Sequence, residues 1–160
     1  MHRRTSLLVL SFAALAACTV SITNEEAKAA FKMAYDYQHG VSVKIDLEKA
    51  AFYYKKAADG GLAEAQFNLG NMYFSGSGVT IDHTSAVEWF RKAAEQGLAQ
   101  AQYNLANAYR SGDGIEQNFP RAAQWYRNAA DRGFPPAQYN LGAMYGNGEG
   151  VPQDYAEAYY

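Results

Sequence analysis

Apolar residues recur along most of the chain with the spacing of amphipathic helices. In one stretch, Ala65, Leu69, Met72 and Tyr73 stand at i, i+4, i+7 and i+8, which places them on one face of a helix. A second helical face follows about twenty residues later and is expected to be buried as well. Its residues are Ala86, Trp89, Phe90, Ala93 and Ala94. No segment shows the alternation typical of a strand, so each unit reads as helix, loop, helix.

This unit repeats every 36 residues. Residues 65–100 and 101–136 align without a gap and share 15 of 36 residues. The same offset reaches back to residues 29–64 and forward to a partial unit at 137–160. A unit with one apolar face on each helix cannot bury itself alone, so neighbouring units must stack. The predicted fold is therefore all-α, a right-handed α/α superhelical solenoid that covers residues 25–160.

Capping residues support the predicted helix boundaries. One repeat position always carries a side-chain oxygen that can accept a hydrogen bond at the start of the second helix. The residues at this position are Asp46, Asp82, Asn118 and Asp154. Glycine pairs such as Gly76 and Gly78 are expected to end the first helix, because glycine adopts left-handed turns readily. Thr23 and Glu26 have the spacing of a capping box at the first helix.

The repeat unit resembles the Sel1-like repeat, a relative of the tetratricopeptide repeat. The shared pattern is A-x-[FY]-N-L-[GA]-x-x-Y, then G-x-G, then [DN], then A-x-x-W-[FY]-R-x-A-A-x-x-G, and it covers most of the chain after residue 17. The resemblance implies a non-enzymatic scaffold for protein complexes, often in the bacterial envelope. The first repeat departs from the pattern at Ser42, where the second loop glycine is expected. The chain stops at Tyr160, one residue before the position aligned with Trp89 and Trp125, so we expect either a truncated chain or an end covered by another molecule.

The first 17 residues differ from the repeats. His2, Arg3 and Arg4 precede an uncharged run from Leu7 to Ala17, which is too short for a membrane span of about 20 residues and fits an export signal. The run ends in Leu-Ala-Ala-Cys, which resembles the signal of bacterial lipoproteins. In that family the cysteine sulfur receives a diacylglyceryl group, the peptide is cut before the cysteine, and its amine is acylated, typically with palmitate. The resemblance makes Cys18 the lipidation site.

These features divide the chain into a lipoprotein signal peptide at 1–17, a lipidated tether at 18–24 and the solenoid. Thr19 follows the cysteine where an Asp would favour inner-membrane retention in the lipoprotein sorting pattern, so we expect an outer-membrane lipoprotein that faces the periplasm. The alternative is an ordinary secretory peptide in which Cys18 is incidental.

Composition narrows the functional classes further. The chain of 160 residues has 14 Lys and Arg against 16 Asp and Glu, and loss of residues 1–17 would make it more acidic. It therefore lacks the basic excess of a nucleic-acid binder. A single cysteine allows neither an internal disulfide nor a cysteine-based zinc site.

Catalysis has little support in the sequence. After residue 17 the only histidines are His39 and His83, and neither has a partner at an equivalent repeat position. Asp113, Glu116 and Asn118 do not form the twelve-residue pattern of a calcium loop. We therefore expect no cofactor and no metal. Some cysteine-rich relatives have been linked to penicillin binding, which leaves a weak penicillin-interacting or peptidoglycan-associated enzyme as an alternative, and a host-contact surface lipoprotein as another.

The polar face of the first helices is the candidate binding site. First helices line the concave surface of such solenoids, and here they carry a row of amides that could read an extended peptide backbone. The proposed groove residues are Asn68, Asn71, Asn104, Asn107 and Asn140. The expected partner is an envelope or periplasmic protein or peptide. The alternative for Asn68, Asn104 and Asn140 is that they tie adjacent helices together.

Overall fold

The computed structural model describes residues 22–159. The predicted signal peptide and Cys18 lie outside the described residues. Within them the chain forms seven α-helices and a short 3-10 helix, with no strand. Their bounds are α1 (Asn24–His39), α2 (Leu47–Asp59), α3 (Ala63–Ser75), α4 (His83–Glu95), α5 (Ala99–Ser111), α6 (Phe119–Ala130), α7 (Pro135–Asn147) and η2 (Glu157–Tyr159). The predicted all-α repeat fold is confirmed.

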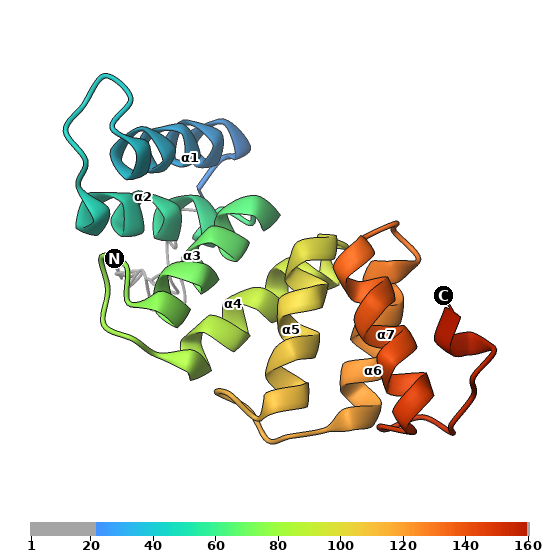
Figure 1. The fold of residues 1–160 in the computed structure, drawn as a ribbon. Coiled ribbons are helices and arrows are strands. Elements are labelled where there is room, and N and C mark those ends of the chain that lie inside the picture. Colours follow the sequence, from blue (N-terminus) through green and yellow to red (C-terminus); the bar gives the residue numbers. More distant parts are fainter. Residues whose placement is uncertain (1–21, 160) are drawn as a thin grey trace, which may run out of the picture.

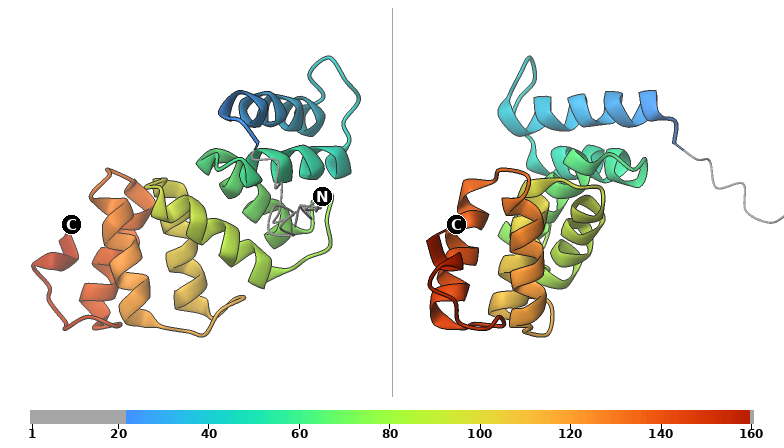
Figure 2. Two further views of the ribbon diagram at one scale, coloured as in Figure 1. Left: turned by 180° about the vertical axis from the view of Figure 1, so that it is seen from behind. Right: turned by 90° about the vertical axis from the view of Figure 1, so that its right-hand side faces the viewer.

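The helices form a zigzag in which each packs mainly on the one before it and the one after it. α1 and α7 lie at opposite ends of the stack (Figure 1). The axes turn along the stack, since α1 and α2 run across the view whereas α5 and α7 run up it (Figures 1 and 2). No helix of the described part is long and apolar enough to cross a membrane.

The predicted caps start the second helices. Asp46, Asp82 and Asn118 each accept a hydrogen bond of 3.0 Å from the backbone N–H three residues later. Thr23 and Glu26 form the predicted capping box at α1. Asp154 accepts from the backbone of Ala156 and Glu157, but the segment after it forms η2 rather than an α-helix.

The second glycine of each loop marks a close approach between repeats. Gly78, Gly114 and Gly150 have φ near +70°. A Cβ added to Gly114 would lie 2.2 Å from the carbonyl oxygen of His83, at the start of the second helix of the preceding repeat. Only glycine fits such a contact. Ser42 holds the same position in the first repeat, also with a positive φ of 61°, but no preceding repeat lies against it within the described residues.

Alanines fill much of the core between paired helices, together with larger aliphatic and aromatic residues. The large buried residues of the second helices are Tyr54, Phe90 and Tyr126. Trp89 and Trp125, which were expected in the core, are only partly buried at its edge, and the Lys92 Nζ lies 3.8 Å from the centre of the Trp89 ring. The predicted burial of Phe90 is therefore confirmed, and that of Trp89 is wrong.

The two ends of the described stack differ in how they are covered. At the C-terminal end, η2 packs on α7, and the backbone of Ala158 lies against Gly142. At the other end, Ala29 and Met33 of α1 are exposed, although their equivalents Ala65 and Leu69 are buried. The larger uncovered apolar face of the described residues is thus on the first repeat.

The cap of α4 should make the free energy of unfolding depend on pH. Hydrogen bonds from the Ser85 hydroxyl and backbone N–H lower the pKa of Asp82. The Asp82 charge therefore stabilises the fold above its unfolded pKa of about 3.9, and this contribution is lost as the pH falls through the lower folded pKa. We expect Asp82→Asn, which copies the uncharged cap at Asn118, to flatten the decline in unfolding free energy between pH 6 and pH 3. Urea unfolding followed by circular dichroism tests this, and an unchanged pH profile would contradict it.

Candidate protein-binding face

Four of the five predicted groove asparagines take part in contacts that join helices. The Asn104 Nδ2 donates to the Asn71 Oδ1 at 3.1 Å, which connects α5 to α3. The Tyr126 hydroxyl donates to the Asn107 Oδ1, and the Asn140 Nδ2 donates to the Tyr103 hydroxyl at 3.4 Å. Asn68 forms no side-chain hydrogen bond within residues 22–159. The helix-tying alternative is therefore seen at Asn104 and Asn140, and also at Asn71 and Asn107.

These ties leave part of each amide unpaired. Among the described residues, no hydrogen bond is formed by the Nδ2 groups of Asn71 and Asn107 or by the Oδ1 of Asn104. Burial raises the pKa of Tyr126, so its hydroxyl remains protonated and keeps donating to Asn107. The face therefore presents two donors and one acceptor whose side chains are held in place. An extended peptide backbone offers the complementary groups.

A hollow of about 130 Å³ opens beside these amides, between the second and third repeats. Phe74, Phe90 and Ala108 give it an apolar floor, and Asn104 and Asn107 lie on its wall. Phe74 is 44% exposed although it is a large apolar residue. Its ring stacks on His83 at 4.7 Å between centroids, which holds the ring in place. The hollow can accommodate one aliphatic side chain.

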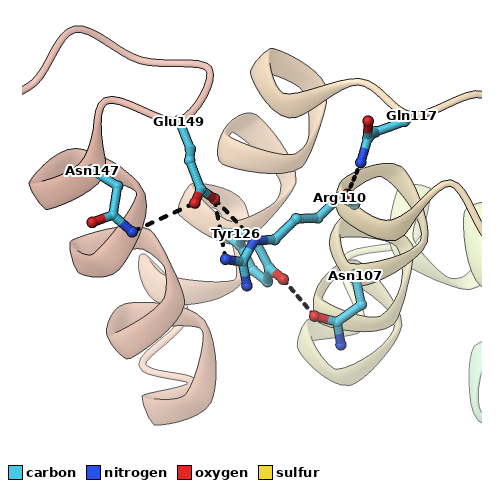
Figure 3. Close-up of polar contacts among 6 residues, drawn as sticks. All are labelled: Asn107, Arg110, Gln117, Tyr126, Asn147 and Glu149. Atoms are coloured by element: carbon cyan, nitrogen blue, oxygen red, sulfur yellow. Dashed lines mark hydrogen bonds and ion pairs between the residues drawn. The ribbon is translucent and has the colours of Figure 1, made fainter.

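A polar groove continues from the hollow toward α7. Ser111 and Asp113 belong to both, and the groove adds Arg110, Gln117 and Glu149. Figure 3 shows Arg110 of α5 reaching Glu149 in the loop after α7, with the Arg110 Nη2 and the Glu149 Oε2 3.1 Å apart. Because both side chains are partly exposed, the pair contributes at most about 1 kcal/mol. Its main effect is to fix the far wall of the groove.

Several residues of this face were not predicted from the sequence. Phe74, Arg110 and Glu149 do not recur from repeat to repeat, so the repeat pattern gave no signal for them. A set of glutamines does recur, at the same position of the second, third and fourth repeats, and this regular spacing is the signal that could have identified them. The side chains of Gln66, Gln102 and Gln138 each donate to a carbonyl at the end of the preceding helix. These glutamines join successive repeats rather than bind a ligand.

The other candidate groups occupy local roles. His39 is exposed at the end of α1 and stacks on Tyr35, and His83 stacks on Phe74. Within residues 22–159 no group of three or more His, Cys, Asp or Glu residues could hold a metal ion. Asn118, considered above with the calcium-loop pattern, is the cap of α6.

Comparisons with known proteins agree with the geometry. The family model for the Sel1 repeat matches residues 27–62, 63–98, 99–134 and 135–160, each starting two residues before the units defined above. The crystal structure of a Sel1 repeat protein from Oxalobacter formigenes is similar, with a TM-score of 0.77 and 39% identity over 82% of this chain and 54% of that one.

A second crystal structure is c5321, a protective antigen present in uropathogenic Escherichia coli strains that displays an SLR fold. It has a TM-score of 0.60 and 34% identity, over 84% of this chain and 36% of that one. This chain thus spans about half and about a third of the lengths of the two proteins. No curated protein matches it.

Proposed function

Because the chain belongs to the Sel1 repeat family, whose members generally mediate protein–protein interactions, we propose that it is a non-catalytic scaffold for a bacterial envelope protein. The partner binds as an extended segment on the face formed by α3, α5 and α7. The observation that carries this proposal is the apolar hollow at Phe74, which is lined also by Asn104 and Asn107. Each of these amides keeps one group, the Asn104 Oδ1 or the Asn107 Nδ2, without a hydrogen-bond partner within the described residues.

The two parts of the face suit different parts of one peptide. An aliphatic side chain of the partner would fill the hollow between Phe74 and Ala108, and its burial supplies affinity. The peptide N–H and C=O groups on either side would pair with Asn104, Asn71 and Asn107. Because hydrogen bonds to other helices already fix these amides, little side-chain entropy is lost on binding.

Capture of a partner through this face provides the test. A photo-crosslinking amino acid at Ser111, in the full chain expressed in a Gram-negative host, should capture a defined envelope protein. The same group at Glu88, which is exposed on α4 outside this face, should not. We expect Phe74→Ala to weaken the capture about tenfold or more, as for an aromatic anchor at an interface centre.

The matched control is Ile81→Ala, since Ile81 is also a large exposed apolar residue but does not line the hollow. Neither change removes a hydrogen bond between helices, whereas Asn71→Ala and Asn107→Ala would. Capture that is equal for Phe74→Ala and the parent protein would reject the proposed face.

We also propose that Cys18 anchors the scaffold to the outer membrane, with the repeats in the periplasm. Support comes from the sequence alone, through the Leu-Ala-Ala-Cys motif that ends at Cys18 and through Thr19, which follows it. We expect the parent protein to incorporate an alkyne-tagged palmitate and to float with membranes, and Cys18→Ser to lose the label. A labelled Cys18→Ser protein would overturn the assignment. Protease added to intact cells should leave the protein intact, because a host-contact lipoprotein on the cell surface would be degraded.

A further inference from the structure

We propose that the α1–α2 loop, together with the adjoining exposed edge of α1, rests on the lipid surface of the membrane that anchors the protein. This surface consists of Met33 on α1 and Val41, Val43, Lys44 and Ile45 in the loop. We call it the first-repeat edge. The inference rests on the proposed lipid anchor at Cys18, and it adds a second contact that sets the orientation of the solenoid.

Exposed apolar side chains are concentrated in the first repeat. Seven of the eleven large exposed hydrophobic residues among those described fall between Met33 and Phe52. In the loop itself, Val41 is 44% exposed and Ile45 is 57% exposed. The loop projects from the end of the stack, beyond the body of the helices (Figure 1). Several exposed apolar residues gathered in one projecting loop indicate an interaction site rather than ordinary surface.

An uncovered end of the solenoid does not account for all of this exposure. Val41 is equivalent to Ser77, Asp113 and Glu149 in the later loops, so only the first repeat has an apolar residue there. Lys44 is equivalent to Thr80, Glu116 and Pro152. The first loop, residues 40–46, thus carries one cation and one acid, whereas the third, residues 112–118, carries two acids and no cation. This gradient runs from the proposed anchor toward the far end of the molecule.

The first-repeat edge is not suited to the stacking of another repeat. Between the internal repeats, the second loop glycine lies almost against the backbone of the preceding second helix, and a Cβ on Gly78 would be 2.1 Å from the carbonyl oxygen of Leu47. Ser42 has a Cβ at this position. A second copy, or any further repeat, that docked as the internal repeats do would therefore collide with Ser42. A fluid lipid surface meets no such obstacle.

The dimensions allow both contacts at once. Six residue steps separate Cys18 from Asn24 at the start of α1, so the tether can reach at most about 21 Å. α1 has 16 residues and is therefore about 24 Å long. The loop lies at the end of α1 opposite to Asn24, and both ends face outward from the stack (Figure 2). With α1 parallel to the membrane, the lipid on Cys18 would keep the Asn24 end of the helix near the membrane surface. The loop would contact the surface at the other end of the helix.

The chemistry of the loop fits the interfacial region of a bilayer. Val41, Val43 and Ile45 can insert among the upper parts of the acyl chains, and the Lys44 ammonium can meet lipid phosphates. Lys44 forms no ion pair within the described residues, so this contact breaks no existing one. Such a loop binds weakly alone, but the anchor makes its contact intramolecular and raises its effective concentration.

The test uses lipidated full-length protein reconstituted into vesicles of phosphatidylethanolamine and phosphatidylglycerol at a ratio of 3 to 1. Because Cys18 is acylated in this protein, a cysteine introduced by Lys44→Cys is the only free thiol and can carry an environment-sensitive fluorophore. We expect lipid-borne nitroxides to quench it at least threefold more than the same fluorophore at Thr80→Cys or Glu116→Cys, the equivalent exposed positions. Val41→Ser combined with Ile45→Ser should abolish the difference, and Ile81→Ser should not.

Each result has a distinct meaning. Equal quenching at the three positions, in protein that still floats with the vesicles, would overturn the lipid contact and leave the anchor standing. Protein that fails to float would instead refute the anchor, and the inference with it. A fluorescence change that appears in detergent without vesicles and grows with protein concentration would assign the edge to a second copy of the chain.

Discussion

Gly114→Ala should lower the free energy of unfolding by about 3 kcal/mol or more. Two effects add at this position. An alanine in the left-handed region costs about 1–2 kcal/mol, and its Cβ would lie 2.2 Å from the backbone oxygen of His83. Because the Cβ is fixed directly on Cα and the His83 oxygen belongs to the backbone, neither can rotate away, and the third loop must separate from α4. Overpacking of this kind costs a further 1–3 kcal/mol.

Two substitutions separate these effects. Gly112→Ala has the same left-handed strain, with φ of 84°, but its Cβ would approach nothing closer than 3.4 Å, so only the smaller loss is expected. Ser42→Ala occupies the equivalent position of the first repeat, where no preceding helix lies within the described residues, and should be nearly neutral. Urea unfolding followed at 222 nm gives the three values. A Gly114→Ala protein no less stable than Gly112→Ala would show that the close approach carries no energetic weight.

Gln102→Glu should cost about 3 kcal/mol of stability at pH 7. Gln102 is 3% exposed, and its Nε2 donates to the carbonyl oxygen of Ala94 at 3.1 Å. Its Oε1 is buried without a hydrogen-bond partner within the described residues. A carboxylate there would lose the donor and face a carbonyl oxygen with no counter-charge, which is among the costly changes a buried site can undergo.

The penalty should depend on pH. Burial would raise the pKa of the carboxyl introduced by Gln102→Glu above its unfolded value of about 4.3, so the penalty should disappear below that value and grow as the pH rises through the folded pKa. Gln66→Glu is the matched control, because the Gln66 Oε1 already accepts from the Gln96 Nε2 at 2.8 Å. We expect a smaller loss there. Equal losses at Gln66 and Gln102 would show that the unpaired oxygen is not the cause.

The repeat pattern was sufficient to predict the all-α repeat fold and the starts of α2, α4 and α6. Asp82 and Asn118 begin helices because a capping side chain acts on backbone only three residues away, so a local pattern identifies it. The buried aromatic residue could not be chosen in the same way. Trp89 and Phe90 are neighbours about 100° apart on one helix, and the apolar pattern includes both. The angle at which α4 packs on α3 decides that Phe90 is buried.

The residues of the candidate site were harder to predict, because their contacts depend on how one repeat packs on the next. Asn71 and Asn104 are 33 residues apart, and whether their amides meet is set by the rotation from one helix pair to the next. Sequence alone therefore left both interpretations of these asparagines open. Phe74 was harder to find, because its importance comes from a hollow that exists only between two repeats. Its equivalents, Arg110 and Gly146, give no hint of an apolar site.

The zigzag of neighbouring helices also bears on how the chain acquires its structure. Each described helix packs mainly on its neighbours in the chain, and even the tie from Arg110 to Glu149 spans only 39 positions. Chains with such local contacts fold quickly, since little loop entropy must be lost before a contact forms. Each helix pair can therefore close without waiting for the repeats beyond the next one. With the proposed export to the periplasm, the amino-terminal repeats can reach their final shape while the later ones are still crossing the membrane.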